Sequence, residues 1–447
     1  MRSSKTLFLC VGVLLFLSLI QPFVGYGKTK KTQPPPKTAK TQSAPKTAQT
    51  PADPNVLTVE AKAAVLADVA TGTRLFEYNP EVLIEPASFT KVLTLYLVFE
   101  AVQRGQIQLQ DEVYISETAW RTGGSKMFVG VGTKVPLEDL IKGIAVVSGN
   151  DACVAVAEHI DGSVGAFIAD MNRKAQELGM VHSAFLNPHG LPAEGQITTA
   201  GDMAILALAY LKQFPEALKY HSMQEYTYNG ITQYNRNHLL RKDSTVDGLK
   251  TGFVEASGYH LTATASRDGM RLVAVVMGAL RPSVREREAA KMLSYGYRRY
   301  TMVNPFKLDQ PVTSVKVWRG VKDQLQLFAA EPCNVLVPQS AKNSVKWTVD
   351  VPTELSAPIV AHQPVGKINF SVGGSPSRSI ALVSHEDVAE ASWIKKIWQT
   401  LVQFRTWNWT YLGAGLAVAL VVPAVLLLVA RVRSRSRSHK RRRVKRY

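Results

Sequence analysis

A serine and a lysine three residues apart could form a nucleophile with its own base. In the segment "PASFTK", Pro86 favours the start of a helix, which puts Ser88 and Lys91 on one helix face. A serine hydroxyl is a weak nucleophile without a base nearby, and a lysine amine serves once burial or another cation lowers its pKa. The helix start also supplies backbone N–H groups for developing negative charge. The pattern alone is weak, since "SAPK", with Ser43 and Lys46, repeats it.

A second group of polar residues interrupts a helical pattern. In "PLEDLIKGIAVVSGNDACVAVAEHI", two apolar helical stretches are separated by Ser148, Gly149 and Asn150. The hydroxyl of Ser148 could relay a proton between Lys91 and a leaving amine, and the amide of Asn150 could orient a substrate. A capped helix start is the alternative, and it explains the motif without any chemistry.

The third group is the triplet Lys250-Thr251-Gly252 in "VDGLKTGFVEASGYHL", which lies between two turn signals and just before a predicted strand. We expect Lys250 to attract a carboxylate and to lower the pKa of the first motif's lysine by like-charge proximity. Thr251 could hydrogen-bond the same carboxylate, and Gly252 would let a substrate pack along the strand edge. The backbone N–H of Phe253 could pair with that of the first motif's serine as an oxyanion hole. A plain loop is the alternative.

The segments around these motifs read as strands at both ends and helices between them. Apolar runs on either side of Thr71-Gly72 predict one hairpin, and runs on either side of Arg267-Asp268-Gly269 predict a second. Helices are predicted through "ASFTKVLTLYLVFEAVQRG", on both sides of Ser148, and through "REREAAKMLSYGYRRY". This order predicts an α/β (α+β) domain around an antiparallel sheet over residues 56–303.

Beyond Asn304 the pattern changes to short alternating runs, such as "TSVKVWRG" and "GKINFSVGG", separated by turn residues. Short strands at regular spacing predict an all-β domain, here over residues 304–385. This segment contains no convincing cluster of catalytic groups. We therefore expect the chemistry to belong to the first domain.

Both ends of the chain carry export and membrane signals. Residues 1–27 combine positive charge, an apolar run and small residues at a cleavage site, which is typical of a signal peptide. The alternative is that this segment is an uncleaved membrane anchor. Residues 28–55 form a Pro/Lys/Thr-rich linker. An amphipathic helix is predicted over 386–410 and a transmembrane helix over 411–430, with a basic tail, 431–447, as the positive-inside signal. We expect a single C-terminal span that contacts membrane lipids, with the catalytic domain on the extracytoplasmic side.

The net charge of +18 over 447 residues is concentrated at the chain ends. The tail holds ten Lys and Arg residues and no acid, whereas residues 56–430 hold 35 basic and 34 acidic ones. A nearly neutral body argues against a nucleic-acid enzyme, so no nucleic acid partner is expected. Cys10, Cys153 and Cys333 imply no disulfide framework, and the nine histidines show no paired metal-ligand spacing, so no metal is expected.

The order of the three motifs is more specific than any one of them. Ser-x-x-Lys, Ser-x-Asn and Lys-Thr-Gly follow one another at separations of 60 and 102 residues, the signature set of penicillin-binding proteins and serine β-lactamases. With "VSGNDACVAVAEHI", "FLNPHGLP" and "YNGITQYNRNHLLRKDSTVDGLKTGFVEASGYHLTATA", the chain resembles the serine D-alanyl-D-alanine carboxypeptidases, or low-molecular-mass penicillin-binding proteins, over roughly residues 56–405. The resemblance implies a β-lactamase/DD-peptidase-like fold: helices flank a five-stranded antiparallel sheet, with the active site along one sheet edge.

The resemblance also implies residue roles. Ser88 is the acylated nucleophile, Lys91 its general base and Ser148 a proton relay. The implied substrate-binding residues are Asn150, Lys250, Thr251, Gly252, Phe253 and Arg285. Arg285 falls where the family keeps an arginine for the terminal carboxylate of the substrate, although a solvated helix face is an equal alternative. The implied partners are peptidoglycan stem peptides and β-lactam antibiotics as acylating inhibitors, and no cofactor is implied.

Three other functions stay open. A class A β-lactamase needs a glutamate for deacylation, and no E-x-x-L-N-like motif occurs between Ser148 and Lys250. DD-endopeptidase activity would be the same reaction on a different amine, and the sequence does not exclude it. A non-catalytic wall-binding protein would keep the fold, but the intact motifs argue against it. The family's usual anchor is an amphipathic helix, so the full span and basic tail are a departure.

Overall fold

The computed structural model describes residues 57–405 and 409–443, so the predicted signal peptide and linker lie outside the described residues. A five-stranded antiparallel sheet in the order β2-β1-β9-β8-β7 forms the centre of the first domain. Its strands are β1 Ala63–Asp68, β2 Arg74–Tyr78, β7 Val246–Val254, β8 Gly258–Arg267 and β9 Met270–Ala279. Both predicted hairpins are confirmed, because β1 pairs with β2 and β8 pairs with β9, each in antiparallel register.

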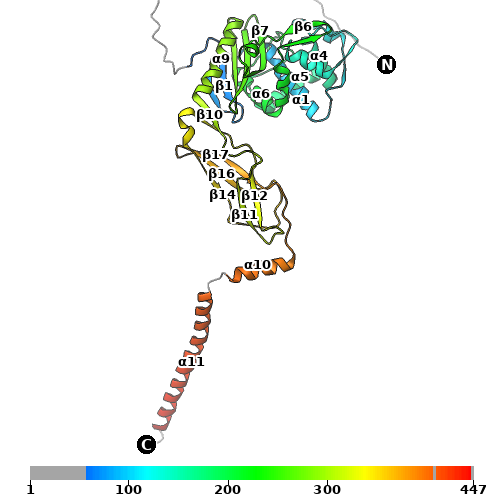
Figure 1. The fold of residues 1–447 in the computed structure, drawn as a ribbon. Coiled ribbons are helices and arrows are strands. Elements are labelled where there is room, and N and C mark those ends of the chain that lie inside the picture. Colours follow the sequence, from blue (N-terminus) through cyan, green and yellow to red (C-terminus); the bar gives the residue numbers. More distant parts are fainter. Residues whose placement is uncertain (1–56, 406–408, 444–447) are drawn as a thin grey trace, which may run out of the picture. The chain divides into compact units, whose positions relative to one another are not determined.

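The central strands are covered on both faces. Along β1, Ala63 and Val65 belong to one hydrophobic core and Ala64 and Leu66 to the other, as the two-residue period of a strand requires. Helices α1, α4, α5 and α6 lie on one side of the sheet and α9 on the other (Figure 1). The predicted fold class is therefore confirmed, and β7 is left as an edge strand.

The helices of this domain follow the predicted order. Helix α1 is apolar around almost its whole circumference, which fits its burial within the helical layer. The helices are α1 Thr90–Gln103, α2 Glu117–Arg121, α3 Leu137–Ala145, α4 Asn150–Asp161, α5 Val164–Leu178, α6 Ala200–Gln213, α7 Leu218–His221, α8 Leu239–Lys242 and α9 Pro282–Arg299. Two 3₁₀ turns, η1 Ala87–Phe89 and η2 Pro215–Ala217, precede α1 and α7. Two small hairpins consist of β3 Glu112–Tyr114 with β4 Lys134–Pro136, and β5 Glu225–Tyr228 with β6 Ile231–Tyr234.

The segment after α9 is built from strands, as its alternating pattern predicts. Six strands form a sheet in the order β14-β16-β17-β12-β11-β15, and β10 pairs with β13. Along β12 the buried and exposed residues alternate, so one face of this sheet packs on a core. The strands are β10 Tyr300–Val303, β11 Thr313–Trp318, β12 Gln324–Ala329, β13 Val335–Pro338, β14 Val345–Asp350, β15 Glu354–Ser356, β16 Pro364–Val372 and β17 Ser375–Val383, with the 3₁₀ turn η3 at Gln339–Ser344.

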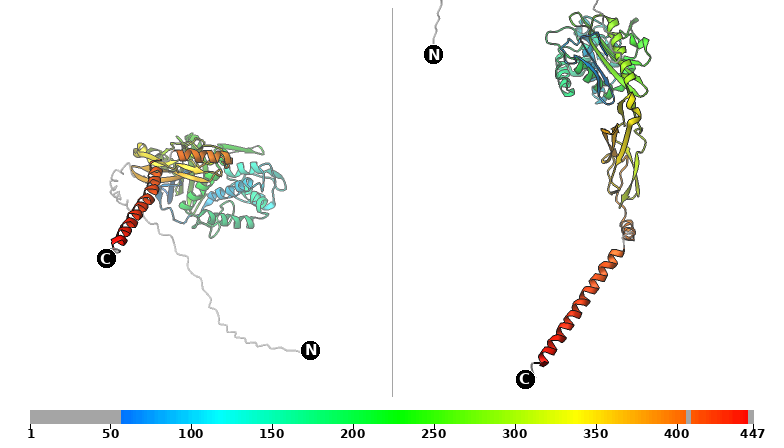
Figure 2. Two further views of the ribbon diagram at one scale, coloured as in Figure 1. Left: turned by 90° about the horizontal axis from the view of Figure 1, so that it is seen from below. Right: turned by 90° about the vertical axis from the view of Figure 1, so that its left-hand side faces the viewer.

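Two helices follow the strands. Helix α10, Trp393–Arg405, exposes the large apolar side chains of Trp393, Ile394, Ile397 and Trp398. Helix α11, Trp409–Arg443, is a single continuous coil in both views of Figure 2, although Pro423 lies inside it. Its stretch Gly413–Arg431 is long and apolar enough to cross a membrane.

Candidate active site

The first motif forms a serine–lysine pair at the start of α1. Ser88 lies in the turn η1 and Lys91 lies one turn further along, in the first turn of α1. The Lys91 side chain is fully buried, and its Nζ atom is 3.0 Å from Ser88 Oγ. The same amine donates a 2.5 Å hydrogen bond to the carbonyl oxygen of His189. The predicted spacing therefore brings the hydroxyl and the amine together, and His189 O holds the amine in place.

The second motif meets the first. The Ser148 hydroxyl donates to Ser88 Oγ over 3.1 Å, so Ser88 is in contact with both an amine and a second hydroxyl. Asn150 is the first residue of α4, as the helix-start explanation requires, but its side chain makes no capping bond. Its Nδ2 instead donates to the carbonyl of Gly123 at 2.7 Å. Asp151 accepts hydrogen bonds from the backbone N–H groups of residues 127–129, which fixes this loop against α4.

The third motif lies within a strand that the sequence did not predict. The predicted strand that follows the triplet is confirmed as β8, but the triplet itself belongs to β7, which begins at Val246. Two glycines in nine residues weaken the strand pattern, and pairing with β8 overrides that weakness. A Cβ atom on Gly252 would lie only 3.2 Å from Ala87 Cβ, so glycine lets the edge strand approach the turn that carries Ser88.

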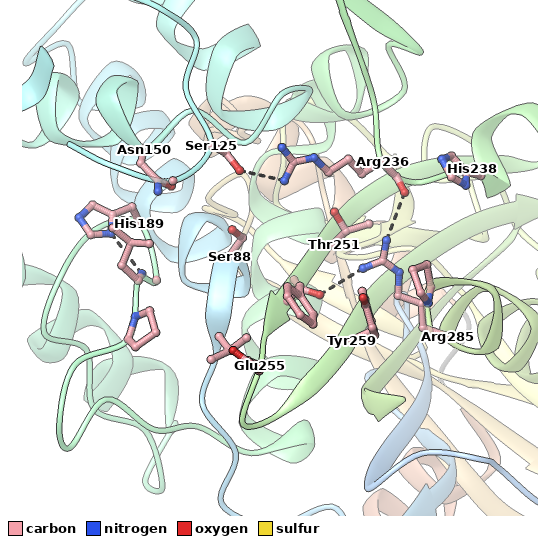
Figure 3. A pocket seen from close by; sticks show the side chains of 18 residues that line it. Ser88, Ser125, Asn150, His189, Arg236, His238, Thr251, Glu255, Tyr259 and Arg285 are labelled. Carbon is pink, nitrogen blue, oxygen red and sulfur yellow. Dashed lines mark hydrogen bonds between the residues drawn. The ribbon is translucent and has the colours of Figure 1, made fainter. Parts of the chain in front are cut away.

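The motifs line one cleft of about 550 Å³. In Figure 3, Ser88 lies between β7, which carries Thr251, and the opposite wall, where His189 and Asn150 lie. The Phe253 ring is half exposed in the cleft and stacks on Tyr259 at 4.3 Å. The pairing of the Ser88 and Phe253 N–H groups as an oxyanion hole stays a prediction.

Arg285 lies at the cleft but is also a structural brace. The side chain is buried, so the alternative of a solvated helix face is wrong. Its Nη1 donates to the carbonyls of Gly252 at 3.1 Å and His260 at 3.2 Å, joining α9 to β7 and β8. Within the described part of the chain, its buried Nε has no hydrogen-bond partner. The Nε donor is therefore unpaired among the described residues, while Nη1 anchors the guanidinium to two strands.

Two cleft residues had no role in the sequence analysis. Arg236 lines the cleft and donates to Ser125 Oγ at 2.8 Å (Figure 3). His189 contributes mainly through its backbone carbonyl, 98 residues from the lysine that it holds. Both residues lie inside quoted family segments, "YNGITQYNRNHLLRKD" and "FLNPHGLP", but no local pattern assigns chemistry to either.

Burial controls the charge of the site's amines. Burial, with a smaller contribution from the nearby Arg236 cation, lowers the pKa of Lys91 to about 8. Cys153 would raise that pKa only as a thiolate, but burial raises the pKa of Cys153 to about 12, so the thiol is neutral. A proton on Lys91 is therefore easily lost.

The charges of Lys250 and Lys91 influence one another. Burial lowers the pKa of Lys250 well below its ordinary value, and the charges of Lys91 and Arg236 lower it further. Repulsion between the two amines is mutual, so each disfavours the charged form of the other, as we expected for Lys250 and Lys91. Burial also lowers the pKa of His189 to about 4, so its ring is neutral. Among the described residues, no group of three or more His, Cys, Asp or Glu side chains could hold a metal ion.

The fold is a five-stranded antiparallel sheet between helices. Along one edge of the sheet lie a Ser-Lys pair, a Ser-x-Asn turn and a Lys-Thr-Gly strand. This combination is typical of serine peptidases of the penicillin-binding class. Residues 45–281 match the family model described as D-alanyl-D-alanine carboxypeptidase, peptidase S11, and residues 300–390 match the model of the penicillin-binding protein 5 C-terminal domain. The chain belongs to this carboxypeptidase family.

Known relatives cover most of the chain. The D-alanyl-D-alanine carboxypeptidase DacC of Escherichia coli K12 is 38% identical over 78% of this chain and 90% of its own. The crystal structure of penicillin-binding protein 5 from Haemophilus influenzae is 36% identical, with a TM-score of 0.65 over 74% of this chain and 98% of that one. Penicillin-binding protein D2 of Listeria monocytogenes, solved in an ampicillin-bound form, is 28% identical, with a TM-score of 0.50 over 54% of this chain and 99% of that one. The predicted family resemblance is confirmed.

Replacing Gly190 by alanine should disable the serine–lysine pair. Gly190 has a φ of +85°, and a Cβ atom there would lie 1.7 Å from the carbonyl oxygen of Ala87. The loop must move to relieve this overlap, which withdraws the adjacent His189 carbonyl from Lys91. Because a displacement of about 1 Å can cost about 100-fold in rate, we expect acylation by benzylpenicillin to slow by about that factor.

Gly195 is the matched control for this variant. It also has a positive φ, of +87°, but a Cβ atom there would make only an ordinary 3.8 Å contact with Leu186. Gly195→Ala should therefore share the backbone strain of Gly190→Ala without the overlap, and it should acylate at close to the wild-type rate. Equal slowing in both variants, measured by stopped-flow fluorescence, would contradict the steric explanation.

The rate of acylation should follow the proton on Lys91. Since the base must be neutral, the rate should rise with pH through about 8. Arg236→Gln removes a cation that lowers the pKa of Lys91, so this rise should move to higher pH. The pH profile of the acylation rate constant measures both effects, and Arg241→Gln, an exposed arginine outside the cleft lining, is the control. A midpoint that stays in place or moves to lower pH in Arg236→Gln would refute this account.

Proposed function

We propose that the chain removes the terminal D-alanine from peptidoglycan stem pentapeptides through an acyl-enzyme on Ser88. The observation that carries this proposal is the 3.0 Å contact between the Ser88 hydroxyl and the fully buried Lys91 amine. A buried amine whose pKa is lowered to about 8 can be neutral near physiological pH and can accept the proton of the hydroxyl.

In the acylation step, Ser88 Oγ attacks the carbonyl carbon of the D-Ala–D-Ala peptide bond while Lys91 Nζ takes its proton. The N–H groups of Ser88 and Phe253 stabilise the oxyanion of the tetrahedral intermediate. Ser148, which donates to Ser88 Oγ, passes its proton to the leaving amine and takes the proton held by Lys91, so Lys91 is neutral again when the C–N bond breaks and D-alanine departs. In the second step, Lys91 takes a proton from the water that attacks the ester carbonyl. The bond between Ser88 Oγ and the carbonyl carbon then breaks, Lys91 returns that proton to Ser88 Oγ, and the shortened peptide leaves.

Cations at one end of the cleft would bind the carboxylate of the terminal D-alanine. Lys250 and Arg236 are close enough for their charges to affect one another, and Arg236 also affects Arg285. A carboxylate between them would gain charge-assisted hydrogen bonds, with the Thr251 hydroxyl as a further donor. Asn150, on the opposite wall, would orient the peptide backbone.

β-Lactam antibiotics would acylate the same serine, since they resemble the D-Ala–D-Ala unit. The ampicillin-bound form of the Listeria protein supports this part of the proposal, because nearly all of that protein aligns with 54% of this chain. The released product would be a tetrapeptide stem, which places the enzyme in peptidoglycan biosynthesis and remodelling and so in the control of cell shape.

We further propose that the catalytic domain works on the extracytoplasmic side of the cell membrane. The apolar stretch Gly413–Arg431 would span the bilayer, with the basic tail on the cytoplasmic side. The exposed Trp393, Ile394, Ile397 and Trp398 side chains of α10 would contact membrane lipids at the outer surface. We propose domain bounds of 56–303 for the catalytic part and 304–385 for the β part.

Intact-mass spectrometry of the detergent-solubilised full chain tests the nucleophile. After incubation with benzylpenicillin, the wild-type protein should gain one covalent adduct and release D-alanine from an N-acylated L-Lys-D-Ala-D-Ala peptide in a parallel assay. Ser88→Ala should do neither. Ser43→Ala, in the "SAPK" copy of the motif, is the matched control and should behave like the wild type. An adduct on Ser88→Ala, or none on the wild type, would overturn the acyl-enzyme mechanism.

A further inference from the structure

Two backbone carbonyls just before Lys250 accept hydrogen bonds from buried side chains. Strand β7 is the edge of the sheet and pairs only with β8, so its outer backbone groups need other partners. His221 Nδ1 lies 2.9 Å from the carbonyl oxygen of Leu249, and Asn237 Nδ2 donates to that of Gly248 at 2.9 Å. We call His221 and Asn237 the carbonyl clamp.

The hydrogen bonds of His221 fix its tautomer. A carbonyl oxygen can only accept, so the Nδ1 atom of His221 must carry the proton that it donates to Leu249 O. Nε2 is then an acceptor, and the Tyr210 hydroxyl, 3.0 Å away, donates to it. Tyr210 and His221 are both almost completely buried, so neither group can turn to water as a substitute partner. The ring is thus a neutral bridge from α6 to the strand that carries Lys250.

His221 must stay neutral in this position. A second ring proton would place an imidazolium beside the Lys250 cation and remove the acceptor for Tyr210. Burial, together with the Lys250 charge, lowers the pKa of His221 to about 3, while its bond to Leu249 O acts in the opposite direction. The bridge therefore keeps its form over the whole range in which the site's amines titrate.

The residues next to the clamp also fix the backbone of Arg236, the arginine that lines the cleft. Asn235 Nδ2 donates to the carbonyl of Met223 at 3.0 Å and makes a longer contact of 3.3 Å with that of His221. Its Oδ1 accepts from the Asn237 backbone N–H at 2.9 Å. Arg236 lies between these two asparagines, so its backbone is fixed on both sides before its side chain enters the cleft.

We propose that the carbonyl clamp is a positioning device for the known reaction: His221 and Asn237 hold the Gly248–Leu249 backbone so that Lys250 faces the serine–lysine pair. The inference rests on the proposed acyl-enzyme on Ser88, because acylation is its readout. Neither clamp residue lines the cleft, so each acts through Lys250 and not on the substrate. Without these donors the edge strand would lose two hydrogen bonds to the rest of the domain and could shift outward, which would take the amine with it.

Two amide variants separate positioning from simple packing. His221→Asn places an N–H donor where Nδ1 stood and keeps the bond to Leu249 O, whereas His221→Gln places its amide at the Nε2 position and loses that bond. We expect acylation of the full chain by benzylpenicillin to slow at least about tenfold in His221→Gln, and His221→Asn to recover most of that loss. The shorter asparagine leaves the larger void, so a faster rate in His221→Asn than in His221→Gln could not be explained by better packing.

Tyr210→Phe serves as the stability control. It removes only the donor to Nε2 and leaves the bond to Leu249 O, so we expect a lower melting temperature and an acylation rate within about threefold of the wild type. If His221→Gln does not fold, Asn237→Leu, which has nearly the same shape but no donor, gives the same test on Gly248 O. It should also slow acylation at least about tenfold.

The outcomes are distinct. Slow acylation in His221→Gln with recovery in His221→Asn supports the clamp. Three results would overturn it. The two amide variants could be acylated at equal rates, or the acylation rate could follow the melting temperature across all variants. The third is a slowing in Tyr210→Phe as large as that in His221→Gln. If the wild-type chain itself is not acylated, the proposed acyl-enzyme on Ser88 fails instead. Acylation of the wild-type chain therefore distinguishes a failure of the clamp proposal from a failure of the proposed function.

Discussion

The structure depends on one contact, the burial of the Lys91 amine between the Ser88 hydroxyl and the carbonyl of His189. A lysine in water is charged and cannot act as a base, so the amine must be desolvated without losing every hydrogen bond. The apolar helix α1 supplies the desolvation, and one backbone carbonyl supplies the partner. The rest of the catalytic domain brings the other groups of the site to this pair.

Close approach of backbone segments is the main structural requirement around it. Ala87, just before the nucleophile, has a φ of +49°, which costs a residue with a side chain of the order of 1–2 kcal/mol. Glycines stand where other segments meet this turn, Gly252 from β7 and Gly190 from the loop that carries His189. A side chain at Gly252 or Gly190 would push β7 or the His189 loop away from the turn that carries Ser88, and so would widen the cleft. The site is therefore formed by packing of backbone against backbone as much as by its polar side chains.

The sequence could predict the parts of this site that local rules determine. Helical spacing alone places Ser88 and Lys91 together, and the turn residues of both hairpins locate the central strands. The hydroxyl of Ser148 could be assigned only through the order of the three motifs, because 60 residues separate it from Ser88. The role of the His189 carbonyl was out of reach, since any residue type presents a carbonyl and only the fold brings this one to Lys91. The strand around Lys250 was missed, because Gly248 and Gly252 interrupt its pattern and only pairing with β8, which no local pattern reveals, makes it a strand.

The central claim is that burial lowers the pKa of Lys91 far enough for its amine to act as a base near physiological pH, and the direct test is an NMR titration of this amine. Protein labelled with ¹³C and ¹⁵N in lysine would be titrated from pH 6 to pH 11, and comparison with a Lys91→Arg variant would assign the Lys91 signal. The account predicts a midpoint near 8 for Lys91, while exposed lysines titrate near their ordinary value of about 10.4. A Lys91 midpoint at that ordinary value would mean a protonated amine beside Ser88, and it would contradict the mechanism.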